Sequence, residues 1–254
     1  MSATISPVAV REQERRGSRI STYSLFAGTW QIGMYFWIAV VIISALVSVV
    51  IHTWDELDGS VADGVLGSAP IFLGVMGIIM PLGTLPLHLA GGGTRRSLFR
   101  GTVAAAVGIG VSFGLAGALG MLVEHLVFNA LDWSSAVVDA GLYDSSGDFF
   151  AIWLSWSLSS IAYFLGGAAI ALGYYRWGGV LGTVQLFVVL ALVIGGEIAL
   201  GGGLYSAGVE HLTGGAVAAP LAVLISLVTS ALVALVLQRT LRDVPLKPNS
   251  ASAC

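Results

Sequence analysis

The stretch Gly91-Gly92-Gly93-Thr94-Arg95-Arg96-Ser97-Leu98-Phe99-Arg100-Gly101 separates two long apolar runs, and its positive charge indicates how the whole chain is arranged. The other basic residues fall in every second connection between apolar runs or near the two ends: Arg11, Arg15, Arg16, Arg19, Arg176, Arg239, Arg242 and Lys247. The alternate connections contain no Lys or Arg and hold acidic residues instead: Asp55, Glu56, Asp58, Asp63, Asp132, Asp139, Asp144, Asp148 and Glu210. Because cytoplasmic loops retain Lys and Arg, this alternation predicts an even number of membrane crossings with both termini in the cytoplasm.

The composition is typical of a polytopic membrane protein. Of the 254 residues, 56% are hydrophobic and only 10% are charged, and the mean hydropathy is +0.91. A single soluble core cannot hide so much apolar surface, so the sequence predicts a membrane protein. The same composition excludes a nucleic-acid-binding function. The only cysteine is Cys254, the last residue, so the sequence predicts neither a disulfide framework nor a metal site.

Six apolar segments are long enough to cross a bilayer as helices, because each exceeds the ~20 residues that a hydrocarbon core of ~30 Å requires. The segments are 30–52, 67–89, 101–128, 149–175, 179–205 and 215–238. They lack the alternation of a membrane barrel, so the predicted fold class is all-α with six transmembrane helices. The chain then divides into a cytoplasmic lead (1–29), a transmembrane domain (30–238) and a cytoplasmic tail (239–254).

Two local patterns add detail to this plan. The later part of the lead, 18–31, has the composition of an amphipathic helix lying flat on the inner surface, and a disordered tail is the alternative. Glycines three or four residues apart remove side-chain bulk from one strip of a helix and predict close packing against protein: Gly110, Gly114, Gly117, Gly120, Gly178 and Gly182.

The usual enzymatic signatures are missing from the sequence. The only lysine, Lys247, is followed by Pro248, so no phosphate-binding Gly-rich loop ends in Gly-Lys-Ser/Thr. No His-Glu-x-x-His zinc motif occurs. The one Gly-x-Ser-x-Gly spacing, Gly110 to Gly114, lies inside an apolar segment and not at the strand-to-helix turn that exposes a serine nucleophile. We therefore expect no enzymatic activity and no cofactor in this chain, and any ATP hydrolysis must come from another one.

The quoted connection itself is a candidate docking element. Thr94 is a competent helix N-cap, and Arg95, Arg96 and Arg100 are predicted to lie on a short helical turn from which Leu98 and Phe99 project as apolar knobs. A short amphipathic element of this kind can dock into a groove of a soluble partner. The alternative is that the arginines only fix orientation and contact lipid phosphates.

The overall layout resembles the membrane subunits of ABC-2-type ABC transporters, particularly small actinobacterial ones. The resemblance covers the topology, the basic lead, the tail and a short motif after the second apolar segment: Gly93, Thr94, Arg95, Arg96, Phe99 and Gly101. It implies that this connection is a coupling helix in contact with a separate ATPase, and that the lead lies on the membrane as a connecting helix.

Two further features are candidates for the transport mechanism. Pro81 and Pro86 fall in the second segment just before the connection, where they form either a hinge or a static bend. Glu197 lies inside the fifth segment, and burial of its carboxylate costs at least ~2.5 kcal/mol even on insertion scales. We expect it to line a pathway or gate, or else to form a structural hydrogen bond with a neighbouring helix.

These observations together favour the transmembrane subunit of an ABC-2-like exporter in a bacterial cell membrane. Its expected partners are a cytoplasmic ABC ATPase, a second permease subunit and the lipid bilayer. Ten arginines against one lysine, with abundant Gly, Ala and Val, fit a GC-rich genome. Two alternatives stay open: a proton- or ion-coupled carrier that uses Glu197, and a membrane scaffold or regulator without transport activity.

Overall fold

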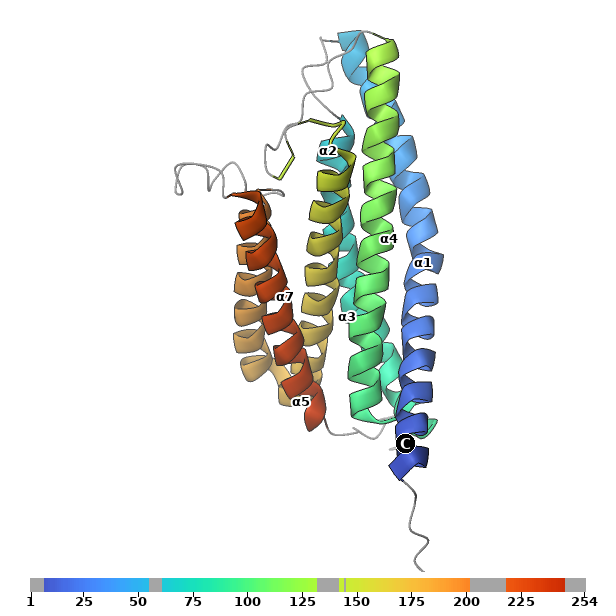
Figure 1. The fold of residues 1–254 in the computed structure, drawn as a ribbon, viewed down its shortest axis with the longest axis vertical. Helices are drawn as coiled ribbons and strands as arrows, with labels where there is room; N and C mark the ends of the chain where they lie inside the picture. Colours follow the sequence, from blue (N-terminus) through green and yellow to red (C-terminus); the bar gives the residue numbers. More distant parts are fainter. Residues whose placement is uncertain (1–6, 55–60, 132–141, 144, 202–217, 245–254) are drawn as a thin grey trace, which may run out of the picture.

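The computed structural model describes residues 7–54, 61–131, 142–143, 145–201 and 218–244, and every regular element within these ranges is a helix. Five of these helices are long and apolar enough to cross a membrane: α1 (Pro7–Trp54), α3 (Ser68–Ala90), α4 (Arg95–Ala130), α5 (Phe149–Leu200) and α7 (Ala219–Arg242). A short helix, α2 (Val61–Leu66), precedes α3. The chain is a membrane protein whose described ranges form a helical bundle (Figure 1).

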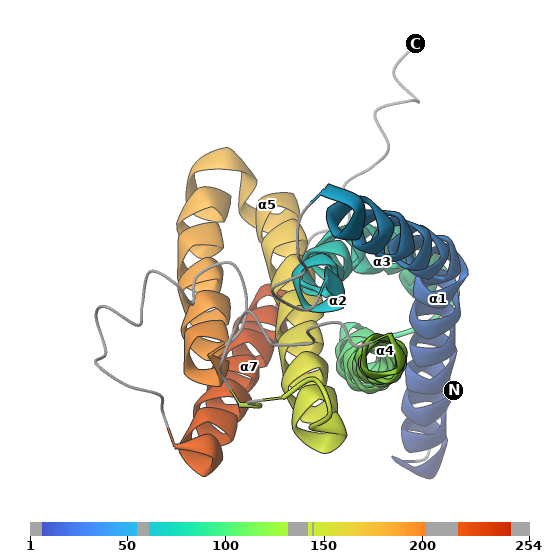
Figure 2. The same ribbon diagram turned by 90° about the horizontal axis from the view of Figure 1, so that it is seen from above.

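The longest helix, α5, is broken at Gly178, whose φ of 75° and ψ of −161° are not helical. Groups on the two sides of the break contact one another: Gln185 Nε2 donates to the Ala169 carbonyl at 2.7 Å, and the Tyr174 and Thr183 hydroxyls lie 3.0 Å apart. The two arms, 149–177 and 179–200, therefore form an antiparallel hairpin (Figures 1 and 2). At 1.5 Å per residue the shorter arm is about 33 Å long, which suffices for a hydrocarbon core of ~30 Å.

The hairpin packs against α3, α4 and α7, while α1 lies at the edge of the molecule against α4 (Figure 2). Glycines permit the closest approach between α3 and the first arm of α5. A Cβ at Gly77 would overlap the backbone of Phe164, and a Cβ at Gly167 would overlap the backbone of Gly74. The two helices can therefore lie this close only because both positions lack a side chain.

The predicted glycine strips are only partly used for packing. Gly110 and Gly114 of α4 lie against the first arm of α5, as expected. A Cβ at Gly110 would overlap Ile161, and a Cβ at Gly114 would overlap Ser157. Gly182 packs on Tyr174 across the hairpin. Gly178 instead forms the break in α5, and a Cβ added at Gly120 would meet no atom of this chain within 4 Å, so packing there stays a prediction for a partner chain.

The first helix differs most from the sequence-based expectation. It begins at Pro7 and runs without interruption through residues 18–29, so these residues are helical, not a disordered tail, and they do not form a separate helix. Packing explains the continuation: Ser21 is buried, and the Ser21 and Thr22 hydroxyls donate to the backbone of α4. The polar residues that weaken the hydropathy signal are thus accommodated by a neighbouring helix.

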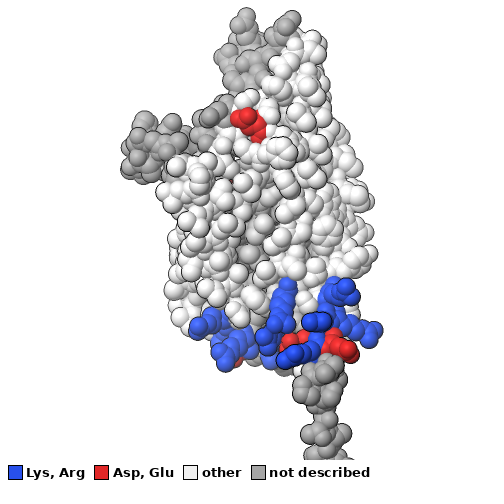
Figure 3. All heavy atoms as spheres, in the orientation of Figure 1, with Lys and Arg blue, Asp and Glu red and all other residues white. Residues whose placement is uncertain are grey.

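The described arginines gather at one end of the molecule, formed by the start of α1, the start of α4, the break in α5 and the end of α7 (Figure 3). We call this the basic end. Its arginines are Arg11, Arg15, Arg16, Arg19, Arg95, Arg96, Arg100, Arg176, Arg239 and Arg242.

Candidate functional site at the basic end

The connection between α3 and α4 is a tight turn closed by hydrogen bonds. Gly92 has a φ of 79°, a left-handed backbone conformation that favours glycine. Thr94 Oγ1 accepts the Ser97 N–H at 3.0 Å, and Ser97 Oγ accepts the Thr94 N–H at 3.0 Å, which completes a reciprocal capping box. Thr94 is therefore the N-cap, as predicted. The predicted short helical turn, however, is the uninterrupted beginning of α4.

Ser97 joins three helices within this turn. Its hydroxyl lies 2.8 Å from His88 Nε2 of α3, and its carbonyl accepts the Ser21 hydroxyl of α1 at 3.4 Å. A Cβ at Gly17 would lie 2.9 Å from Ser97 Oγ, so α1 fits here only because residue 17 has no side chain. Ser97 is only 1% exposed, so its own contacts at the junction of α1, α3 and α4 are shielded from solvent.

Three further side-chain contacts tie α1 to the same connection. Gln13 Nε2 donates to the Gly92 carbonyl at 3.2 Å, and Thr22 Oγ1 donates to the Gly101 carbonyl at 3.3 Å. Arg100 forms an ion pair with Glu14 at 3.3 Å. A solvent-exposed pair of this kind contributes only about 0–1 kcal/mol, so it orients the two helices more than it holds them.

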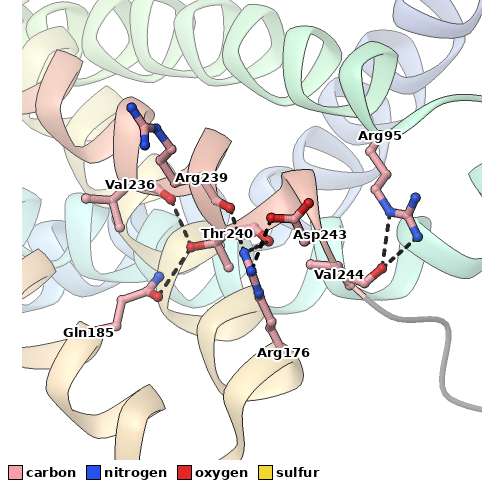
Figure 4. A network of polar contacts seen from close by, with 8 residues as sticks. All are labelled: Arg95, Arg176, Gln185, Val236, Arg239, Thr240, Asp243 and Val244. Atoms are coloured by element: carbon pink, nitrogen blue, oxygen red, sulfur yellow. Dashed lines mark hydrogen bonds and ion pairs between the residues drawn. The ribbon is translucent and has the colours of Figure 1, made fainter.

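Arg176 holds the end of α7 from the break in α5 (Figure 4). Its Nη1 donates to the carbonyls of Arg239 and Thr240 at 2.7 and 3.1 Å, and its Nη2 lies 3.3 Å from the Asp243 carboxylate. These carbonyls belong to the last turn of a helix, where backbone oxygens lack helical donors. The guanidinium charge also suits the negative end of the helix dipole.

Arg95 holds the same end of α7 from the start of α4 (Figure 4). Its Nε and Nη2 both donate to the carbonyl of Val244, at 3.1 and 2.7 Å. One turn inward, Thr240 Oγ1 donates to Oε1 of Gln185 at 3.3 Å. The connection after α3 is thereby linked through α7 to both arms of α5.

The predicted ATPase-coupling residues do not all face outward. Thr94, Arg96 and Arg100 are exposed at the basic end. Leu98 is 0% exposed and belongs to the main hydrophobic core, and Phe99 packs against that core. The expectation that Leu98 projects as a knob is therefore wrong, because the first turn of α4 buries this side chain within the protein. Phe99 is half-buried, and its contact with a partner stays a prediction.

The two prolines lie inside α3, which remains one helix as far as Ala90. Proline has no N–H, so the carbonyls four residues earlier, at Gly77 and Leu82, lose their helical donors. Thr84 Oγ1 also donates to the Met80 carbonyl at 2.8 Å, a contact that bends helices. Pro81 and Pro86 thus weaken α3 next to the connection, and their use as a hinge stays a prediction.

Glu197 lies far from the basic end. It is 7% exposed, and Ser159 on the other arm of α5 donates its hydroxyl to Glu197 Oε2 at 2.7 Å. At 1.5 Å per residue, its position is about 28 Å along the helix from Gly178. The structure therefore does not bring Glu197 together with the residues at positions 94–100.

Sequence analysis missed several residues that complete the basic end. His88, Ser97, Gln13 and Arg176 make side-chain contacts between helices, and Val244 contributes its carbonyl. A polar residue within about one turn of a predicted span end is a usable signal for His88, Ser97 and Arg176, but Gln13 lies far from any predicted span. A backbone carbonyl leaves no signal in the sequence.

No family model, curated protein or solved structure matches this chain. Within the described ranges, no group of three or more His, Cys, Asp or Glu residues is arranged to hold a metal ion. The function is therefore inferred from the arrangement of the basic end.

Proposed function

We propose that the chain is the transmembrane subunit of an ABC-2-like exporter, which forms a translocation pathway with a second permease subunit. A separate cytoplasmic ABC ATPase supplies the energy. In this proposal each arm of α5 crosses the membrane of a bacterial cell, so the chain crosses six times. The basic end and both termini then lie in the cytoplasm.

The observation that carries the proposal is the linkage of the connection after α3 to the rest of the protein. Within about ten residues this connection contacts α1 through Gln13 and Glu14, and α7 through Arg95. Its capping box also contacts His88 at the end of α3. A displacement of this connection therefore moves several helices at once, because packed helices respond as rigid elements.

A simple mechanical cycle follows from this linkage. The ATPase contacts the exposed groups of the connection, Thr94, Arg96 and Arg100. Its closure on ATP displaces the start of α4, and the contacts of Arg95 and Arg176 transmit the movement to α7 and the α5 hairpin. The proline-weakened part of α3 bends to allow the displacement. Access to the pathway then alternates between the two faces of the membrane.

Substitution of Arg96 tests the predicted contact with the ATPase. Arg96 is exposed and belongs to the connection, so Arg96→Gln should reduce the recovery of an ABC ATPase with the affinity-purified protein. Loss of one exposed interfacial charge corresponds to about 1 kcal/mol, or a roughly fivefold lower recovery. The measurement is quantitative mass spectrometry of the purified complex.

Arg242→Gln is the matched control, because it removes the same exposed charge from the same end of the molecule but from α7. It should leave ATPase recovery near the parent level. Equal recovery with both variants and the parent would mean that the connection serves only to fix orientation. Absence of any ABC ATPase from the purified parent would remove the exporter proposal itself.

One observation favours a second candidate, a proton- or ion-coupled carrier. Glu197 is a buried carboxylate at a distance from every described arginine, and Ser159 is the hydrogen-bond partner found for it. Buried carboxylates in membrane helices commonly belong to ion pathways. Transport that stops when the proton or sodium gradient is dissipated, at constant ATP, would favour the carrier.

A further inference from the structure

A shallow hollow of about 430 Å³ lies between α1 and α4 on the side of the basic end. Its lining residues on α1 are one helical turn apart or adjacent, so they form one face of that helix. The hollow is lined by Ser18, Arg19, Thr22, Tyr23, Phe26 and Ala104. It does not overlap the contacts of Arg95, Arg176 or Glu197.

Arg19 brings an unbalanced positive charge to this hollow. Arg15 and Arg16 precede it by four and three residues, so its nearest charged neighbours on the helix are also positive. Glu14, the acidic residue close by, is paired with Arg100. Within the described part of the chain Arg19 has no ion pair, and its planar group of donors suits a phosphate.

The two ends of the hollow differ in chemistry. Ser18, Arg19 and Tyr23 supply donors at the end toward the arginines, and Phe26 and Ala104 form an apolar wall farther along the helices. From Arg19 to Phe26 the distance along α1 is about 10 Å. A ligand that fits carries a phosphate on one side and hydrocarbon on the other.

We propose that this hollow binds an anionic phospholipid of the leaflet that meets the basic end. The phosphodiester contacts Arg19 and the hydroxyl of Tyr23, and the first part of an acyl chain lies along Phe26 and Ala104. Basic pockets between membrane helices bind lipid headgroups in this way. The site needs only insertion in a membrane and is independent of the exporter proposal.

The test measures phosphatidylglycerol bound to the purified protein by native mass spectrometry. Arg19→Gln should weaken binding roughly fivefold, the effect of one basic residue at a membrane surface. Ala104→Leu keeps every charge and fills the apolar part of the hollow, and it should weaken binding as well. Both residues are exposed, so the variants should keep the parent melting temperature.

Arg11→Gln is the control, because it removes an equally exposed charge from α1 outside the hollow. It should leave binding unchanged within twofold, phosphatidylcholine with the same chains should bind more weakly, and excess inorganic phosphate should not displace the bound lipid. Equal losses with Arg19→Gln and Arg11→Gln would overturn the site in favour of a diffuse charge effect. Displacement by inorganic phosphate, or full binding by Ala104→Leu, would show that the hollow binds an anion without its hydrocarbon.

Discussion

Glu197 and Ser159 form a buried hydrogen bond between the two arms of α5, at 2.7 Å. The loss of folding stability on removing this hydrogen bond depends on which atom a substitution takes away. A glutamine at position 197 keeps a carbonyl oxygen for the Ser159 hydroxyl and removes the charge. An alanine removes the acceptor and leaves a buried hydroxyl unpaired, which costs about 1–3 kcal/mol.

We therefore expect Glu197→Gln to keep the melting temperature of the parent in detergent, and Glu197→Ala to lower it by several degrees. Transport by reconstituted protein then separates the possible roles. A folded Glu197→Gln variant without transport would support a gate or ion site that acts by charge. Full transport by the same variant would restrict Glu197 to joining the two arms.

Single residues also show where sequence analysis fails. Thr94 was identifiable as an N-cap, because capping needs only local residue types in the right order. The burial of Leu98 was not predictable from the sequence, because the orientation of the first turn of α4 depends on the helices around it. The contact of Arg95 with the Val244 carbonyl joins positions 149 residues apart, and any residue type at 244 offers that carbonyl.

At the scale of helices, Gly178 decides whether α5 is one rod or a hairpin. Its φ of 75° with ψ of −161° lies in a region that is essentially restricted to glycine. Gly178→Ala should therefore destabilise the protein by about 1–3 kcal/mol, measured as a lower melting temperature. Gly179→Ala is the matched control, since Gly179 is exposed and a Cβ there has no neighbour within 4 Å. Equal stability of the two variants would mean that the chain reverses elsewhere.

The helices were predictable in proportion to their apolar content. The predicted segments 67–89 and 149–175 match α3 and the first arm of α5 closely, because uninterrupted apolar runs leave helix as the available state. The extension of α1 back to Pro7 was not predictable. Its polar residues are held by α4, and hydropathy contains no information about such a neighbour.

At the scale of the whole molecule, the described arginines remain on one side after folding. These ten residues, scattered over most of the sequence, meet at one end of the structure (Figure 3). The sequence predicted this gathering because alternate connections return to the same side. The interhelical contacts among these arginines, such as Arg176 with the end of α7, follow from packing and were not predictable.

The proposed topology places both the connection after α3 and the break in α5 in the cytoplasm, and cysteine labelling tests the two together. Cys254, the only cysteine, is first replaced by Ser. Single cysteines then replace Gly91, Gly179 and Ser145, all exposed positions outside the tight helix contacts. On intact cells an impermeant thiol reagent should label Ser145→Cys alone, and after permeabilisation it should label all three.

Labelling of Gly179→Cys on intact cells would mean that the first arm of α5 does not end in the cytoplasm, which contradicts six crossings. Labelling of Gly91→Cys on intact cells, with Ser145→Cys protected, would reverse the orientation and remove the basic end from any cytoplasmic ATPase.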